Sequence, residues 1–99
     1  MIKKAKPAKG MCKVTFVVSK EIAGSAQKAN LVGEFNNWGL TADAMKKQKD
    51  GSFSLVKDLA VAQEYQFRYI LDGERWENDC CADKYSKNEF GAENSIVVL

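Results

Sequence analysis

The stretch that decides the fold is EYQFRYILDG, residues 64–73. Large apolar residues recur at every second position, namely Tyr65, Phe67, Tyr69 and Leu71. A period of two is typical of a β-strand with one buried face, so we expect this aromatic face in the core and Arg68 on the outside. Asp72-Gly73 favours a tight hairpin turn because both residues tolerate positive φ. A partner strand is therefore predicted in ERWEN, residues 74–78.

The same alternation predicts strands elsewhere in the chain. They are CKVTFVV (12–18), KANLVGEF (28–35), AMKKQK (44–49), SFSLVKDL (52–59) and NSIVVL (94–99), with a second Asp-Gly turn at residues 50–51. About seven short strands without a helical period predict an all-β fold, an immunoglobulin-like antiparallel β-sandwich. Its aromatic core is expected to contain Phe16, Phe35, Phe53, Tyr65, Phe67 and Tyr69. Residues 78–93 are long for a connection without structure of its own, and such loops are often binding loops.

Length and composition predict one globular domain. The chain has 99 residues, of which 45% are hydrophobic and 28% charged, and its net charge is +2. Four lysines and the single proline fall at the start, so residues 1–11 are expected to be a basic, flexible tail and residues 12–99 the domain. No apolar run is long enough to cross a bilayer and no signal-type apolar segment is visible, so we expect no membrane association and a cytoplasmic location.

The three cysteines, Cys12, Cys80 and Cys81, are expected to be reduced and structurally dispensable, since their number is odd and no secretion signal is visible. Adjacent cysteines suggest zinc, but the chain has no histidine and one further thiol, which is short of the four ligands of a structural site. We therefore expect neither a metal nor a cofactor.

Catalysis is poorly supported by the residue types. Without histidine the common general base is missing, and no Ser–His or Cys–His nucleophile can be assembled. Glu77, Asp79 and Asp83 could serve as a glycosidase carboxylate pair or bind Ca²⁺, but a solvated acidic loop is the expected role of these residues in so small a chain. The chain is expected not to be an enzyme.

Two tryptophans fall at predicted sheet ends. Trp38 lies in LVGEFNNWGL, residues 31–40, between turn-forming residues, and Trp76 follows the Asp72-Gly73 turn. Each alone is most simply a partly buried core ring. Together with the outward-facing Arg68, and with Phe90 in a polar loop, they indicate an exposed aromatic surface.

These residues resemble family 48 of the carbohydrate-binding modules, which includes the glycogen-binding domain of the AMP-activated protein kinase beta subunit and the early-set N-terminal domains of isoamylases and branching enzymes. LVGEFNNWG, YQFRYILDGERW, FGAEN and NSIVVL are similar to the family's motifs, in order and spacing, from about residue 28 to residue 99. The chain departs from the pattern at Ala92, where the kinase subunits carry a hydroxyl residue, and by one extra residue before Trp76.

The resemblance implies a binding site for an α-1,4-linked glucan such as glycogen, starch or maltooligosaccharide. Trp38 and Trp76 would stack on glucose rings, Arg68 and Asn94 would hydrogen-bond sugar hydroxyls, and Phe90 would enter the curve of the glucan. Asn36 or Asn37 is a further candidate for hydroxyl binding. A glycogen-metabolising enzyme or another protein is a candidate partner.

Two other classes of function stay open at this point. Early-set sandwiches also serve as protein-docking or regulatory modules without binding sugar, and we rank this role second. Nucleic-acid binding ranks third, because neither an RRM signature nor a basic stripe interleaved with aromatic residues is visible. We expect no nucleic-acid partner.

Overall fold

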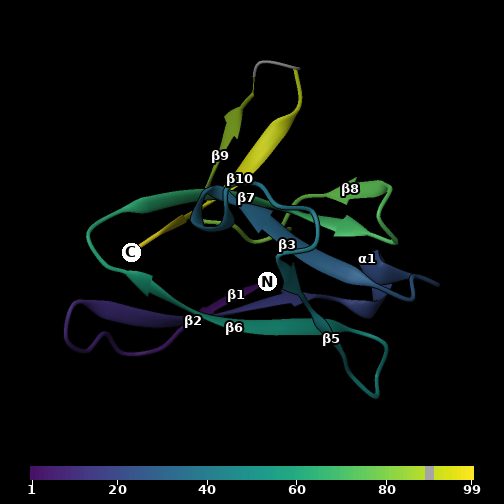
Figure 1. The fold of residues 1–99 in the computed structure, drawn as a ribbon, viewed down its shortest axis with the longest axis horizontal. Helices are drawn as coiled ribbons and strands as arrows, with labels where there is room; N and C mark the ends of the chain where they lie inside the picture. The colour runs from purple at the N-terminus through teal and green to yellow at the C-terminus, as the bar shows by residue number, and fades with distance from the viewer. Residues whose placement is uncertain (89–90) are drawn as a thin grey trace.

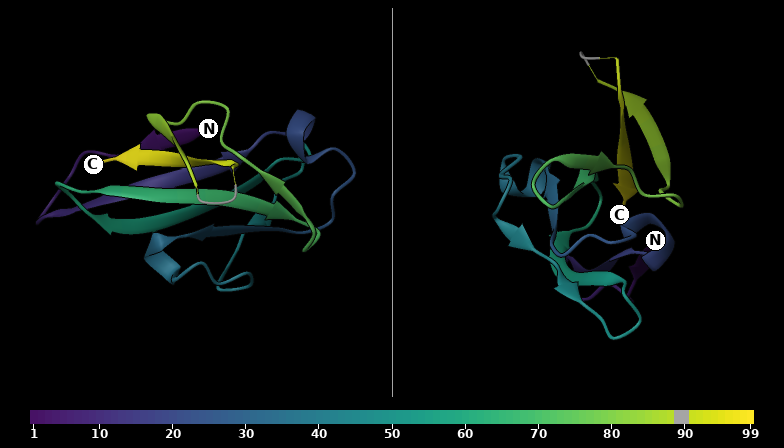
Figure 2. Two further views of the ribbon diagram at one scale, coloured as in Figure 1. Left: turned by 90° about the horizontal axis from the view of Figure 1, so that it is seen from above. Right: turned by 90° about the vertical axis from the view of Figure 1, so that its right-hand side faces the viewer.

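The computed structural model describes residues 1–88 and 91–99 and folds them into two antiparallel sheets packed as a sandwich (Figures 1 and 2). The strands are β1 (Ile2–Lys4), β2 (Met11–Val18), β3 (Ala29–Gly33), β4 (Asp43–Ala44), β5 (Lys46–Lys47), β6 (Phe53–Ala60), β7 (Glu64–Leu71), β8 (Arg75–Glu77), β9 (Lys84–Lys87) and β10 (Glu93–Val98). A short helix, α1 (Lys20–Ala23), and a 3-10 turn, η1 (Glu34–Asn36), complete the described elements. The predicted all-β antiparallel sandwich is confirmed.

The strand order defines the two layers. One sheet has the order β1-β2-β6-β5, and the other has the order β4-β3-β7-β10-β9, with β8 paired to β7 beyond the end of β10. The expected number of strands was about seven, and the described residues form ten. The difference arises because residues 44–49 divide between two sheets as β4 and β5, and because β1 and β9 were not expected.

The core lies between the sheets and is largely aromatic. Phe16 of β2 meets Phe67 of β7 edge to face with 5.0 Å between ring centroids, and Phe67 packs in the same manner on Tyr69 at 5.6 Å. Of the six aromatic residues predicted for the core, Phe16, Phe53, Phe67 and Tyr69 are buried, while Phe35 and Tyr65 are partly buried and packed against them. The alternation in sequence therefore identified the buried face.

The two Asp-Gly turns differ from each other. In the β7–β8 turn both Asp72 and Gly73 have positive φ, 53° and 72°, as expected, and the register Leu71↔Arg75 leaves three residues in the loop. In the β5–β6 turn Gly51 has φ 92° while Asp50 is not in the positive region, and the register Lys47↔Phe53 leaves a longer loop. The β5–β6 turn is thus wider than the tight hairpin predicted.

Two segments expected to lack structure are strands. β1 pairs with β2 through Ile2↔Phe16 and the next two residue pairs, so residues 2–4 do not belong to a flexible tail. β9 pairs with β10 over four residue pairs, so the long connection before the last strand is itself partly sheet. The β9–β10 hairpin extends away from the body of the sandwich (Figure 1). Among the described residues, no helix is long and apolar enough to span a membrane.

Candidate functional site

The outer face of the six-stranded sheet carries most of the candidate residues. On β7, Arg68 alternates with the buried Phe67 and Tyr69 and so points away from the core. Residues directly opposite one another in an antiparallel pair share a face, which places Val32 of β3 beside Arg68 and Trp76 of β8 beside Ile70. Arg68 and Trp76 therefore lie on one surface.

The β7–β8 turn sets the direction of Trp76. The extra residue before this tryptophan is absorbed in the three-residue loop, so that Trp76 stays opposite Ile70 on the outer face. The Asp72 carboxylate accepts hydrogen bonds from the amides of Gln27 and Lys28 at 2.8 and 3.0 Å, which ties the turn to the segment before β3. These backbone hydrogen bonds lower the pKa of Asp72.

Arg68 and Trp76 are in direct contact. The guanidinium carbon of Arg68 lies 5.2 Å from the centroid of the Trp76 ring, which is a cation–π distance. The Nε atom of Arg68 is buried and has no hydrogen-bond partner among residues 1–88 and 91–99. Trp76 keeps 39% of its surface exposed. One face of a large ring is thus supported by the cation while the residue remains open to solvent.

Trp38 has an unusual backbone conformation. Both Asn37 and Trp38 follow η1 with positive φ, 55° and 58°, a region that bulky residues rarely adopt. The Trp38 amide donates to the carbonyl of Gly33 at 2.9 Å, and Trp38 is 39% exposed. Strain of this kind costs about 1–3 kcal/mol and often marks functional segments.

The turn that carries Trp38 is fixed by two other residues. The side chain of Asn36 accepts from the Gly33 amide at 3.1 Å and donates to Asp43 at 2.7 Å, so this asparagine is engaged within the loop. A Cβ at Gly33 would lie 2.6 Å from the carbonyl oxygen of Gln66, which only glycine avoids. Close approach of β3 and β7 at this point therefore requires the glycine of the LVGEF motif.

Trp38 and Trp76 are anchored near different positions of β7. The amide of Trp38 is hydrogen-bonded to Gly33 of β3, and Gly33 pairs with Phe67 of β7. Trp76 pairs with Ile70, further along the same strand. Three residues of strand separate these positions, which is about 10 Å at about 3.3 Å per residue. Arg68 lies between the two attachment points.

Asn94 is buried, with 6% of its surface exposed, and its amide already has partners. It donates to the side-chain oxygen of Gln66 at 2.9 Å and accepts from Asn88 at 3.3 Å. Gln66 was not identified as a site residue from the sequence, although it lies two residues before Arg68 on the same face. The period-two pattern could have found it. Phe90 lies outside the described residues.

The carboxylates considered for catalysis each have a structural partner. Asp83 pairs with Lys4 at 2.7 Å, Glu77 lies 3.7 Å from Arg75, and Asp79 is buried and accepts from the Tyr69 hydroxyl at 2.6 Å. Their contacts tie loops and strands together.

A family model supports the resemblance seen in the motifs. The model for carbohydrate-binding module 48, described as the isoamylase N-terminal domain, matches residues 6–86, which include Trp38, Arg68 and Trp76 but neither Phe90 nor Asn94. Comparison with curated protein sequences found no match. The match covers most of the chain, and the chain folds into a β-sandwich whose outer face carries the tryptophan–arginine pair. The chain therefore belongs to the carbohydrate-binding module 48 family.

Proposed function

We propose that this chain is a non-catalytic module that binds α-1,4-linked glucan, such as glycogen, starch or maltooligosaccharide, by stacking of Trp38 and Trp76 on glucose rings. The observation that carries the proposal is the half-exposed Trp76 ring held against Arg68 on an open sheet face, in a chain of a carbohydrate-binding family. The positive φ of Trp38 is a second support, because a strained tryptophan at a turn is difficult to explain by core packing.

The chemistry of a pyranose suits this surface. Its C–H face is apolar, and burying about 100 Å² of such surface on an indole contributes roughly 2.5 kcal/mol. Arg68 adds guanidinium N–H donors beside the ring, and these donors suit sugar hydroxyls. Asn94 would act mainly by orienting Gln66, given its burial and its two amide contacts. Phe90 keeps the role of apolar contact that the family resemblance gives it.

The test is electrophoresis in native gels with and without glycogen, with bovine albumin as the reference protein. We expect the wild type to be retarded by glycogen and the variants Trp38→Ala and Trp76→Ala to be retarded less. Val56→Ala is the matched control, because Val56 is an exposed apolar residue on the other sheet, and this variant should behave as the wild type.

Titration of the tryptophan fluorescence with maltoheptaose gives the affinities, and each tryptophan substitution should weaken binding by roughly 1–3 kcal/mol. Equal mobility of all proteins with and without glycogen, with no spectral change at millimolar sugar, would reject glucan binding. The protein-docking role would then take first place.

A further inference from the structure

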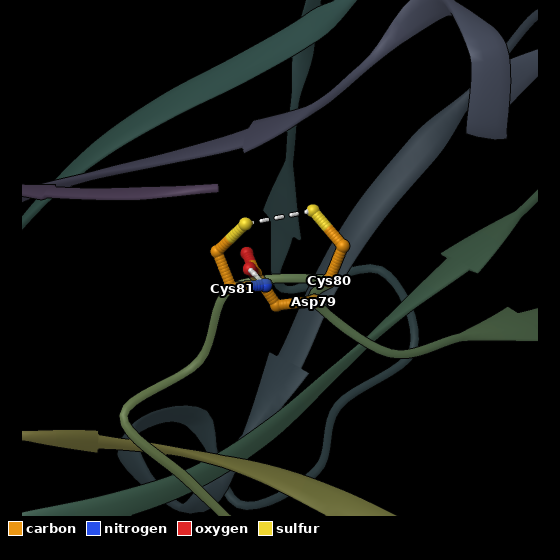
Figure 3. A group of neighbouring side chains, drawn as sticks. All are labelled: Asp79, Cys80 and Cys81. Atoms are coloured by element: carbon orange, nitrogen blue, oxygen red, sulfur yellow. Dashed lines mark hydrogen bonds between the residues drawn. The ribbon is translucent and has the colours of Figure 1, made fainter.

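The connection between β8 and β9 brings two thiols together. The Sγ atoms of Cys80 and Cys81 lie 3.1 Å apart, and both residues are exposed (Figure 3). Adjacent side chains on an extended strand would point to opposite faces. Cys80 and Cys81 instead lie in a turn, which places both sulfurs on the same side. The family resemblance and the proposed glucan surface leave this cysteine pair unexplained.

The turn that carries the two cysteines is anchored to the sheets. Asp79 is buried, its amide donates to the Ser95 hydroxyl at 2.9 Å, and its carboxylate accepts from the Tyr69 hydroxyl at 2.6 Å and the Cys81 amide at 2.7 Å. The Tyr85 hydroxyl also donates to the Asp79 carbonyl oxygen at 2.5 Å. The sulfurs are thus held together by the fold around them.

A metal ion fits this cluster poorly. The ligand atoms of Asp79, Cys80 and Cys81 lie within 4.8 Å of one another. However, the Asp79 carboxylate already accepts from Tyr69, from the Cys81 amide and from the Met1 ammonium group at 2.6 Å. Two thiols are then left for a metal that usually takes four protein ligands in a structural site. The chemistry available to the pair is that of two sulfurs alone.

We propose that Cys80 and Cys81 form a redox modification site, at which the two thiols close reversibly to a vicinal disulfide with a small disulfide such as oxidised glutathione as the oxidant. One cysteine thiolate attacks a glutathione sulfur, the glutathione S–S bond breaks, and one glutathione thiolate leaves. The second cysteine thiolate then attacks the protein sulfur of this mixed disulfide and displaces the second glutathione. The pair loses two electrons and two protons, and oxidised glutathione is reduced to two thiols.

The geometry favours closure and easy reopening. A disulfide needs its sulfurs at about 2.0 Å, so the pair must approach by about 1 Å from its present separation. Adjacent Cα atoms are about 3.8 Å apart, which is less than the roughly 4.4–6.8 Å of ordinary disulfides. The closed ring would therefore be strained and more easily reduced than a structural disulfide.

Either thiol can make the first attack, because both residues are exposed. Hydrogen bonding to Cys80 and the charge of a Cys80 thiolate raise the pKa of Cys81. A mixed disulfide at Cys80 removes that charge, which favours the second attack by Cys81.

The test is equilibration of the folded chain in glutathione buffers of increasing oxidised fraction, followed by alkylation, trypsin digestion and mass spectrometry. Cleavage after Arg75 and Lys84 releases both cysteines in one peptide, residues 76–84, while Cys12 falls in residues 10–13. We expect the first peptide to lose two hydrogens and both alkylation sites together, and to regain both sites after treatment with dithiothreitol. Cys12 is buried and should stay reduced, which makes it an internal reference.

Two controls separate a built site from ordinary thiol reactivity. The variants Cys80→Ser and Cys81→Ser should each stop at a single glutathione adduct. A synthetic peptide of residues 76–84 should require a larger oxidised fraction than the folded chain, because it lacks the contacts to Tyr69, Ser95 and Tyr85. The proposal is overturned if both cysteines remain alkylated in every buffer, if each carries its own glutathione or links two chains, or if the free peptide oxidises as readily as the protein.

Discussion

The two faces of β7 carry residues of different kinds within one strand. Phe67, Tyr69 and Leu71 face the core and are fully buried, whereas Gln66 and Arg68 face outward and are half-buried. The inner residues contact the rings of the same sheet and of the opposite sheet. Of the outer residues, Gln66 accepts a hydrogen bond from Asn94, and Arg68 makes a cation–π contact with Trp76.

This difference separates stability from binding. Inner residues are expected to determine the free energy of unfolding, and outer residues the affinity for the ligand. The separation is incomplete at Ile70, which lies on the outer face and yet is buried, with Trp76 opposite it on β8. Trp76 therefore lies beside a buried apolar residue and also keeps part of its surface open to solvent.

The largest expected effect is on the inner face. Phe67→Ala should lower the free energy of unfolding by about 3–5 kcal/mol, since it removes a buried ring from the centre of the core. Urea denaturation followed by tryptophan fluorescence measures this loss, and Phe67→Leu provides a milder variant if the alanine protein does not fold. A loss below about 1 kcal/mol would contradict the assignment of this face to the core.

A second effect is expected at the inner hydroxyl of Tyr69. Tyr69→Phe removes a donor from the buried Asp79 carboxylate and should lower the free energy of unfolding by about 1–3 kcal/mol. Tyr65→Phe is the matched control, because the Tyr65 hydroxyl donates to the carbonyl of Ala60 in a part-exposed setting, and its loss should cost less. Equal losses in the two variants would show that burial of the acceptor does not matter here.

On the outer face we expect substitutions to affect ligand affinity more than the free energy of unfolding. Arg68→Ala should weaken maltoheptaose binding by roughly 1–2 kcal/mol through loss of the Trp76 contact and of sugar hydrogen bonds, with a smaller change in the free energy of unfolding. Calorimetric titration measures the first quantity and urea denaturation the second. Lys13→Ala, which removes an exposed basic residue from the other sheet, should leave affinity unchanged. A variant of Arg68 that loses stability but binds normally would assign this residue to the fold alone.

The smallest effect expected is the pH dependence contributed by Asp72. Because its pKa is lowered in the folded chain by hydrogen bonds from Gln27 and Lys28, the folded state is favoured when Asp72 is ionised. This contribution is present above the pKa of the unfolded chain, about 4, and is lost as the pH falls through the lower folded value. Asp72→Asn should therefore flatten the loss of stability in acid.

Thermal unfolding between neutral and acid pH tests this expectation for Asp72→Asn. Glu74→Gln, in the same loop, is the control variant. Parallel pH profiles for wild type and Asp72→Asn would show that the turn is not held by the ionised carboxylate.

The sequence predicted features that depend on local pattern. Alternation identified the buried face of β7 and of β2, and the Asp72-Gly73 turn was located because its positive φ values depend on the two residues themselves. The family motifs pointed to the segments that carry Trp38 and Trp76. These are properties of a few neighbouring residues.

Features that depend on distant partners were missed. β1 is a basic segment whose strand character comes from pairing with β2, and β9 is formed by pairing with β10 in a polar stretch. The buried Asp79 carboxylate accepts from the Tyr69 hydroxyl of β7, and the Gln66–Asn94 contact joins residues 28 positions apart. Nothing in the local pattern gives either contact.

The strand order has a consequence for solubility. Among the described residues, the strands with an open edge at the sides of the two sheets are β1, β5, β4, β9 and β8, all short. Edge strands present unpaired backbone groups to which another chain can add. Three of these strands carry two lysines each, Lys3 and Lys4, Lys46 and Lys47, and Lys84 and Lys87. Bringing two such edges together would oppose like charges along the new pairing. Copies of this domain crowded side by side along a polymer would therefore resist joining into a continuous sheet.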